Sequence, residues 1–327
     1  MWLSSSSVGR KFVMALTGAC LVLFVTFHCL MNAVAICWPA AYNSVCEFLG
    51  ANWYALGASA ILAILFIIHI IYAVMLTLQN RRARGNDRYL VSKRPKTVEW
   101  SSQNMFVLGV VILAFLVVHL IQFWAKMQLQ EIRGVHDVIP PAAGTLFLQE
   151  AFSLVWTPIV YIIGFIALWF HFNHGFWSMF QSIGWDNTRW NTPPVLQIGC
   201  WWASVVVVLF IAQAIVFTVR AHEDYYKTDP VLRLQYKEML APMFEKDFGP
   251  DAAQAIGMAP YDQAEQMVRG TYSQLKNPEA ATYFANDPEY PARVATLERA
   301  VALFDYLEVA APEPLEMEPA NVANPTK

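Results

Sequence analysis

Four histidines lie inside long apolar runs, where an ionisable side chain is costly and needs a reason. They are His28 in FVTFHCLM, His69 in FIIHIIYA, His119 in LVVHLIQF and His171 in LWFHFNHG. A single histidine in such a run is explained as well by a hydrogen-bonded core position or a proton path as by metal binding. Four in successive runs favour a shared role, and paired imidazoles that bind a haem iron are the leading interpretation.

The apolar runs that hold these histidines are long enough to cross a bilayer. The chain has 327 residues, of which 57% are hydrophobic and 14% charged, whereas a soluble domain carries about 25% charged residues. A membrane-spanning helix needs about 20 apolar residues, so we predict an all-α integral membrane protein. Its five expected transmembrane helices cover roughly residues 12–36, 54–78, 104–125, 152–177 and 196–219.

The composition changes after residue 220. Residues 1–220 hold 13 Lys and Arg against 7 Asp and Glu, and residues 221–327 hold 9 against 18. The second part contains three stretches with helical apolar spacing. We therefore predict a membrane domain over 1–220 and a mostly helical, soluble C-terminal extension over 221–327. The end of the extension, about 311–327, is rich in proline and acidic residues and is predicted to be disordered.

Lysine and arginine are unevenly distributed among the loops, which predicts the orientation in the membrane. The N-terminal segment ends in Arg10 and Lys11, and the loop over 79–103 holds seven basic residues. The loop over 37–53 holds none. Because positive charge marks the cytoplasmic side, we expect a cytoplasmic N-terminus. After five crossings, the extension over 221–327 is expected outside the cytoplasm.

Depth within the spans sorts the histidines into two pairs. Counted at about 1.5 Å per helical residue from the span ends, His28 and His119 lie at a similar depth, nearer the outside. His69 lies nearer the inside, at the depth of both His171 and His174, which depth alone does not separate. This arrangement predicts two bis-histidine haems in a four-helix core.

Glycines recur at a fixed distance from the two outer histidines. Gly18 precedes His28 by ten residues, and Gly109 precedes His119 by the same number. Ten helical residues cover about 15 Å, so each glycine lies near the depth of the inner pair. Gly175 lies one turn beyond the fourth histidine, on the same helix face. Close helix packing is the alternative reason for such glycines, but the repeated offset favours clearance for a flat macrocycle.

The cysteines do not form a metal-binding pattern. None of the five belongs to a CxxC pair, so zinc and iron–sulfur ligation are not indicated. Cys37 and Cys46 share one loop and would pair only in an oxidising compartment. Two free thiols are the favoured interpretation.

Four sequence elements together resemble a known family. They are SSVGRK–x5–TG–x9–H at residues 6–28, His69 in the second span, LG–x9–H ending at His119, and HFNHGFW–x7–W at residues 171–185. In this order the chain resembles the cytochrome b membrane-anchor subunit of succinate:quinone oxidoreductases, the succinate dehydrogenases and fumarate reductases. The likeness is to the single-chain type with five helices and two haems b, and it covers most of residues 1–190.

The resemblance implies a choice for the fourth iron ligand. The family's fourth-helix signature is similar to His-x3-Gly, which here selects His171 with Gly175. His174 would then support the ligand or contact a haem propionate. The implied iron ligands are therefore His28 with His119, and His69 with His171.

Haem propionates are anionic and need hydrogen-bond donors at the inner mouth of the bundle. The basic cluster over residues 81–96 is mostly explained by the positive-inside rule and by docking of an iron–sulfur subunit. The propionate candidates are Ser7, Arg10 and Lys11, with Arg81 and Arg82 on the second span.

The resemblance implies a three-subunit enzyme complex in the bacterial cytoplasmic membrane. A flavoprotein interconverts succinate and fumarate, an iron–sulfur protein relays electrons, and this chain is the respiratory membrane anchor that exchanges them with menaquinone. Two haems b are the implied cofactors, and two imidazoles per iron leave no open position for oxygen. The same architecture serves either direction of the reaction. A dimer of heterotrimers is one assembly that the resemblance allows, and nucleic acid is not an expected partner.

The chain departs from one feature of some family members. These carry a glutamate, linked to transmembrane proton transfer, two residues before the fourth-helix ligand, where this chain has Trp169. Glu47, expected at the outer start of the second span, is the candidate to accept a proton during quinone chemistry. The alternative is an exposed loop acid next to Cys46.

Two other functions compete with this interpretation. A haem b anchor of another respiratory oxidoreductase, such as a nitrate reductase or a hydrogenase, would show different histidine spacing. A transporter that uses histidines as a proton relay would need acidic partners, and none of the five predicted spans contains Asp or Glu.

Overall fold

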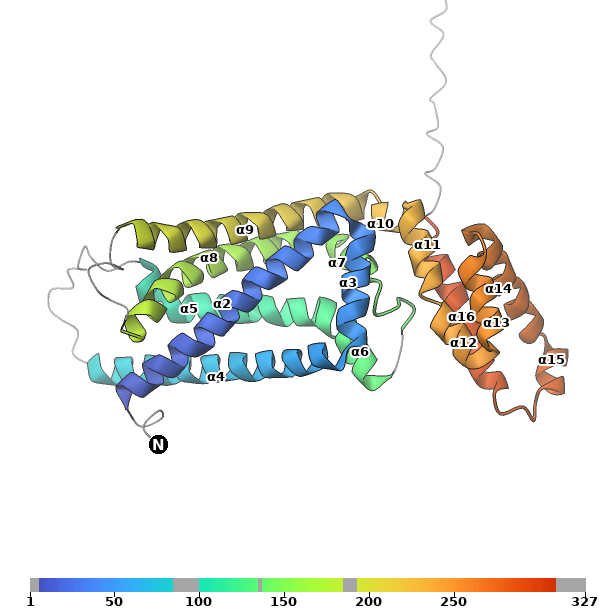
Figure 1. Cartoon of the computed structure of the whole chain (residues 1–327), viewed down its shortest axis with the longest axis horizontal. Coiled ribbons are helices and arrows are strands. Elements are labelled where there is room, and N and C mark those ends of the chain that lie inside the picture. The colour runs from blue at the N-terminus through green and yellow to red at the C-terminus, as the bar shows by residue number, and fades with distance from the viewer. Residues whose placement is uncertain (1–5, 85–99, 135–136, 185–192, 310–327) are drawn as a thin grey trace, which may run out of the picture.

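The computed structural model describes residues 6–84, 100–134, 137–184 and 193–309, and every regular element in these ranges is a helix. Five stretches of helix are long and apolar enough to cross a membrane, which confirms the predicted all-α, multi-pass architecture. They lie along the long axis of the molecule (Figure 1). They are α2 (Ser7–Cys37), α4 (Trp53–Arg84), α5 (Trp100–His119) continued by the π-helix η1 (Leu120–Trp124), α8 (Trp156–Ser182) and α9 (Pro193–His222).

Helices α2 and α8 each pack against three of the other four spans. Helix α2 crosses the bundle diagonally (Figure 1) and packs against α4, α8 and α9, while α5 packs against α8. Helix α4 lies at the edge and contacts α2 far more than any other helix. Many large apolar side chains on the spans point outward, such as Leu23, Ile61 and Val208. An apolar belt of this extent is stable against membrane lipid and unstable against water.

The first span is capped at one end and followed directly by another helix at the other. The Ser6 hydroxyl accepts a hydrogen bond from Gly9 N at 2.9 Å and so caps α2. After Cys37 the chain turns into α3 (Pro39–Ala51), which has proline in its first turn. The expected loop over 37–53 is therefore mostly helix. Glu47 lies within α3 and not at the start of the second span.

Two more short helices lie at the same end of the bundle as α3. They are α6 (Gln128–Arg133) and α7 (Gly144–Phe152), and nearly all side chains of α7 are buried. Helix α7 can pack this closely on α3 because Gly144 has no side chain. A Cβ atom there would clash with Cys46 and Tyr42. The five cysteines are all free thiols, Cys37 and Cys46 included.

The C-terminal extension is a bundle of short helices at the end of the spans that carries α3, α6 and α7 (Figure 1). The three stretches predicted to be helical cover residues 221–244, 262–277 and 290–310. Their described residues are mostly helical, and the first stretch is divided among the end of α9 and three short helices. The predicted disorder over about 311–327 lies outside the described residues. The helices are α10 (Tyr225–Thr228), α11 (Pro230–Glu238), α12 (Ala241–Phe248), α13 (Pro250–Met258), α14 (Tyr261–Leu275), α15 (Pro278–Tyr283) and α16 (Tyr290–Leu307).

A buried polar network joins the extension to the membrane domain. Asn43 on α3 accepts hydrogen bonds from Thr145 N at 2.9 Å and Oγ1 at 2.8 Å, and it donates to Gln235 Oε1 at 3.0 Å. The Tyr236 hydroxyl lies 2.7 Å from Thr145 Oγ1 and donates to the Tyr226 carbonyl at 2.9 Å. Burial raises the pKa of Tyr236, so this phenol stays neutral. The network fixes the extension against α3 and α7.

Candidate functional site

The structure places His28 on α2 beside His119 at the end of α5. Their ring centroids are 5.7 Å apart and their planes are nearly perpendicular, at 87°. We call them the outer pair, because they lie nearer the end of the bundle that carries the extension. Four phenylalanine rings pack around the pair. These are Phe24, Phe115, Phe123 and Phe210, with centroids 5.3–6.2 Å from one of the two imidazoles.

The second pair, which we call the inner pair, joins α4 to α8. The rings of His69 and His171 have centroids 6.4 Å apart, with an interplanar angle of 63°. Of the two histidines that depth could not separate, His171 is therefore the one whose ring meets His69. His174 lies one turn further along α8, as a neighbour of His171.

The spacing of both pairs fits one metal ion held between two imidazoles. Metal–nitrogen bonds of about 2 Å place two such ring centroids roughly 6 Å apart, close to the observed 5.7 and 6.4 Å. Among the described residues, no group of three or more His, Cys, Asp or Glu side chains is arranged to hold a metal ion. A pair of imidazoles suits a metal whose remaining ligands come from a macrocycle, as in haem.

The ring nitrogens of three of the four histidines have protein partners. His119 Nδ1 lies 3.2 Å from the Tyr161 hydroxyl, and His69 Nδ1 lies 3.2 Å from Thr17 Oγ1. On both rings this leaves Nε2 for another ligand. His28 differs, because its Nε2 lies 3.3 Å from the amide of Asn32. Iron binding through this nitrogen requires that contact to break.

The Nδ1 atom of His171 is buried without a hydrogen-bond partner in the described part of the chain. Buried polar atoms are nearly always satisfied, so this nitrogen calls for a partner such as a water. An iron bound through Nε2 of the same ring would not supply that partner.

Gly18 and Gly109 lie against the inner pair, at the depth that the ten-residue offset predicts. A Cβ atom on Gly18 would be 3.6 Å from His69 Cε1, and one on Gly109 would be 3.9 Å from His171 Cε1. Both are ordinary contacts, so packing against the rings does not itself require glycine. Gly164 behaves differently, because a Cβ there would clash with Phe115. Gly175 has nothing within 4 Å of an added Cβ.

The polar candidates lie away from the histidine pairs, near the helix ends. Ser7 and Lys11 are exposed and Arg10 is half-buried in the first turns of α2. Arg81 and Arg82 are exposed at the end of α4, where the Arg81 guanidinium lies over the Phe106 ring at 5.8 Å. Glu47 is exposed on α3. The rest of the basic cluster, residues 85–96, lies outside the described residues.

Trp169, two residues before His171, has a structural partner. Its indole Nε1 donates to Ser204 Oγ on α9 at 3.0 Å. The side chain thus ties α8 to α9 and carries no ionisable group.

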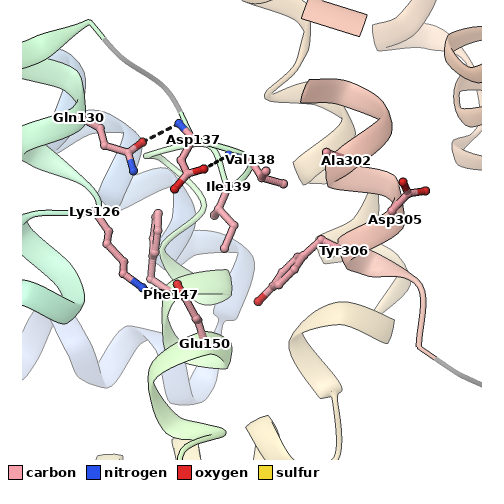
Figure 2. Close-up of a pocket in the computed structure, with 10 residues that line it drawn as sticks. All are labelled: Lys126, Gln130, Asp137, Val138, Ile139, Phe147, Glu150, Ala302, Asp305 and Tyr306. Carbon is pink, nitrogen blue, oxygen red and sulfur yellow. Dashed lines mark hydrogen bonds and ion pairs between the residues drawn. The ribbon is translucent and has the colours of Figure 1, made fainter. Parts of the chain in front are cut away.

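A cavity of about 460 Å³ lies between the segment over residues 126–150, which includes α6 and α7, and helix α16 of the extension (Figure 2). Tyr306 on α16 points across it toward α7, and its pKa is raised to about 12, chiefly by burial. Lys126 and Glu150 form an ion pair at 2.5 Å, and Asp305 pairs with Arg269 at 2.7 Å. The fourth charged side chain of the wall, Asp137, accepts a hydrogen bond from Val138 N at 2.9 Å. Lys126 is the one cation among these lining residues and is already paired, so the cavity does not indicate an anionic ligand.

Comparison with known proteins does not assign this chain to a group. No family model, curated protein or solved structure matches it. The functional interpretation therefore depends on the four histidines and on the residues around them.

Proposed function

We propose that this chain is the di-haem b membrane anchor of a succinate dehydrogenase or fumarate reductase, and that it exchanges electrons with menaquinone. The observation that carries the proposal is the meeting of four intramembrane histidines in two pairs, on four different spans, at metal-binding separation. Each haem supplies a one-electron carrier without an open position for oxygen. The glycine offset puts the two pairs about 15 Å apart along the spans.

The residues of the chain hold and shield the cofactors in this proposal. His28 and His119 would bind one iron, and His69 and His171 the other. Phenylalanines pack against the outer pair, and an apolar environment would favour electron transfer over side reactions with solvent. Gly18 leaves the space beside the inner pair open for a macrocycle.

The charge distribution supports an orientation in the bacterial cytoplasmic membrane. Arg10, Lys11, Arg81 and Arg82 lie at the end of the bundle opposite the extension (Figure 1). By the positive-inside rule that end faces the cytoplasm. The flavoprotein and iron–sulfur subunits would dock there, and the extension would lie outside the cytoplasm.

Single histidine substitutions test the pairing. The haem content and the reduced spectrum of each purified variant are measured against the parent protein. His28→Ala and His119→Ala are expected to lose the same haem, and His69→Ala and His171→Ala the other. His222→Ala, at an exposed position at the end of α9, is the control and keeps both. Loss of both haems from every variant, or of haem from the control alone, would contradict the assignment.

The enzyme assignment needs a separate test, because other respiratory complexes also use haem b anchors. The chain is purified with its native partners, and succinate or fumarate is added to the complex. Succinate-dependent haem reduction, or fumarate-dependent oxidation of the reduced haems, is expected. Haems that respond only to another donor, such as hydrogen, would leave the cofactor assignment standing and overturn the substrate assignment.

A further inference from the structure

The outer pair contains a chain of buried polar groups within an otherwise apolar bundle. The Tyr161 hydroxyl lies 3.2 Å from His119 Nδ1 and donates to Gln122 Oε1 at 3.0 Å. Gln122 Nε2 in turn donates to Thr157 Oγ1 at 3.1 Å. Tyr161, Gln122 and Thr157 are all buried. Such groups are costly to bury and remain only where each is satisfied.

The direction of these hydrogen bonds fixes the proton on His119. A tyrosine hydroxyl has one proton, and Tyr161 gives it to Gln122. Its oxygen can then only accept from the imidazole, so His119 must carry its proton on Nδ1. The unprotonated Nε2 is left with its lone pair, which is the form that binds a metal.

The same arrangement occurs at the inner pair on a different helix. Thr17 Oγ1 lies 3.2 Å from His69 Nδ1 and donates its own proton to the Val13 carbonyl at 2.9 Å. The threonine oxygen therefore also accepts from the imidazole, and His69 carries its proton on Nδ1. In each pair, one histidine thus donates its Nδ1–H to a hydroxyl oxygen. That hydroxyl donates its own proton to a different acceptor.

The backbone after His119 forms a π-helix that places Gln122 in this series of hydrogen bonds. The π-helix η1 begins at Leu120, and its wide turn is closed by Ala125 N donating to Leu120 O at 2.8 Å. Within η1, Ile121 faces outward while Gln122 is buried against Tyr161. Single π turns inside α-helices concentrate at functional sites.

We propose that Tyr161 and Thr17 are positioning residues that hold His119 and His69 in the tautomer with Nε2 free to bind iron. An acceptor for the Nδ1–H also makes the imidazole more basic, so each hydroxyl lowers the reduction potential of its own haem. This inference rests on the proposed function, because it presupposes a haem at each pair.

The test is a redox titration of two matched variants. Tyr161→Phe and Thr17→Val each remove one hydroxyl and keep nearly the same shape. Tyr161→Phe is expected to keep both haems and raise the potential of the outer haem alone. Thr17→Val is expected to raise that of the inner haem alone. Loss of a hydrogen bond to a metal-binding histidine typically costs about 10–100-fold in metal affinity. Each factor of ten by which the loss is larger for ferric than for ferrous iron raises the potential by about 59 mV.

Thr17→Ser is the control, since it restores the hydroxyl and the native inner potential. The haem that responds is identified from the histidine variants above. Two bound haems with unchanged potentials, or equal shifts of both haems in one variant, would overturn the inference. So would loss of the inner haem from both Thr17→Val and Thr17→Ser, because it would assign the effect to packing. A parent protein without haem would instead overturn the proposed function itself.

Discussion

At the scale of single residues, the glycines fall into two kinds: those required by close packing against a neighbour, and those that leave space beside the histidines. Gly164 is required by its neighbour, because a Cβ there would clash with Phe115. Gly18 and Gly109 have no such neighbour, although each lies against a histidine of the inner pair. The proposed haem, as a flat group between the helices, would account for the absent side chains there.

Gly18→Leu is therefore expected to displace the inner haem. Its branched side chain would enter the space beside His69 that the macrocycle needs. The purified variant should lose about half of its haem, with the outer haem retained, since only one of two bis-histidine sites is affected. Gly57→Leu on α4 is the matched control, because nothing lies within 4 Å of a Cβ at Gly57. Full haem content in Gly18→Leu would refute the clearance role.

At the scale of elements, the short helix α3 connects the spans to the extension. Asn43 on α3 accepts from the backbone and side chain of Thr145 on α7, and donates to Gln235 on α11. Asn43 and Thr145 are fully buried. An unsatisfied donor at such a place costs more than the hydrogen bond contributes.

Asn43→Ala should therefore destabilise the docking of the extension. The backbone N–H of Thr145 loses its acceptor, which costs about 1–3 kcal/mol for a buried group. Thermal unfolding of the detergent-solubilised protein, with limited proteolysis of the extension, measures the effect. Glu47→Gln, at an exposed position of the same helix, is the control and should unfold like the parent. Equal stability of the two variants would show that the network does not hold the extension.

Pattern and depth alone predict much of the site. Apolar runs define the spans, and the constant rise of a helix brings His28 to the depth of His119 and Gly18 to that of the inner pair. Other features depend on contacts that no local pattern shows. Asn43 meets Gln235 across 192 residues of chain, and the π turn after His119 leaves no periodic signal. Thr17 belongs to the TG–x9–H motif, which the sequence shows. Its hydrogen bond to His69 depends on the packing of α2 against α4, which the sequence does not show.

At the scale of the whole molecule, the two ends of the bundle differ in character. One end carries the half-buried Arg10 and exposed basic side chains of α2 and α4. The other carries α3, α6, α7 and the extension (Figure 1). Between them the histidine pairs lie at two levels, so each end of the bundle has one pair nearer to it. This arrangement is compatible with the electron path that we propose.

The haem content of the purified full-length chain tests the central claim most directly. The protein is isolated from the membrane, reduced with dithionite, and its haem is counted as the pyridine haemochrome per mole of polypeptide. The two bis-histidine pairs predict about two haems b per chain, with a low-spin reduced spectrum, since both axial positions are filled. A well-folded protein without haem would contradict the account.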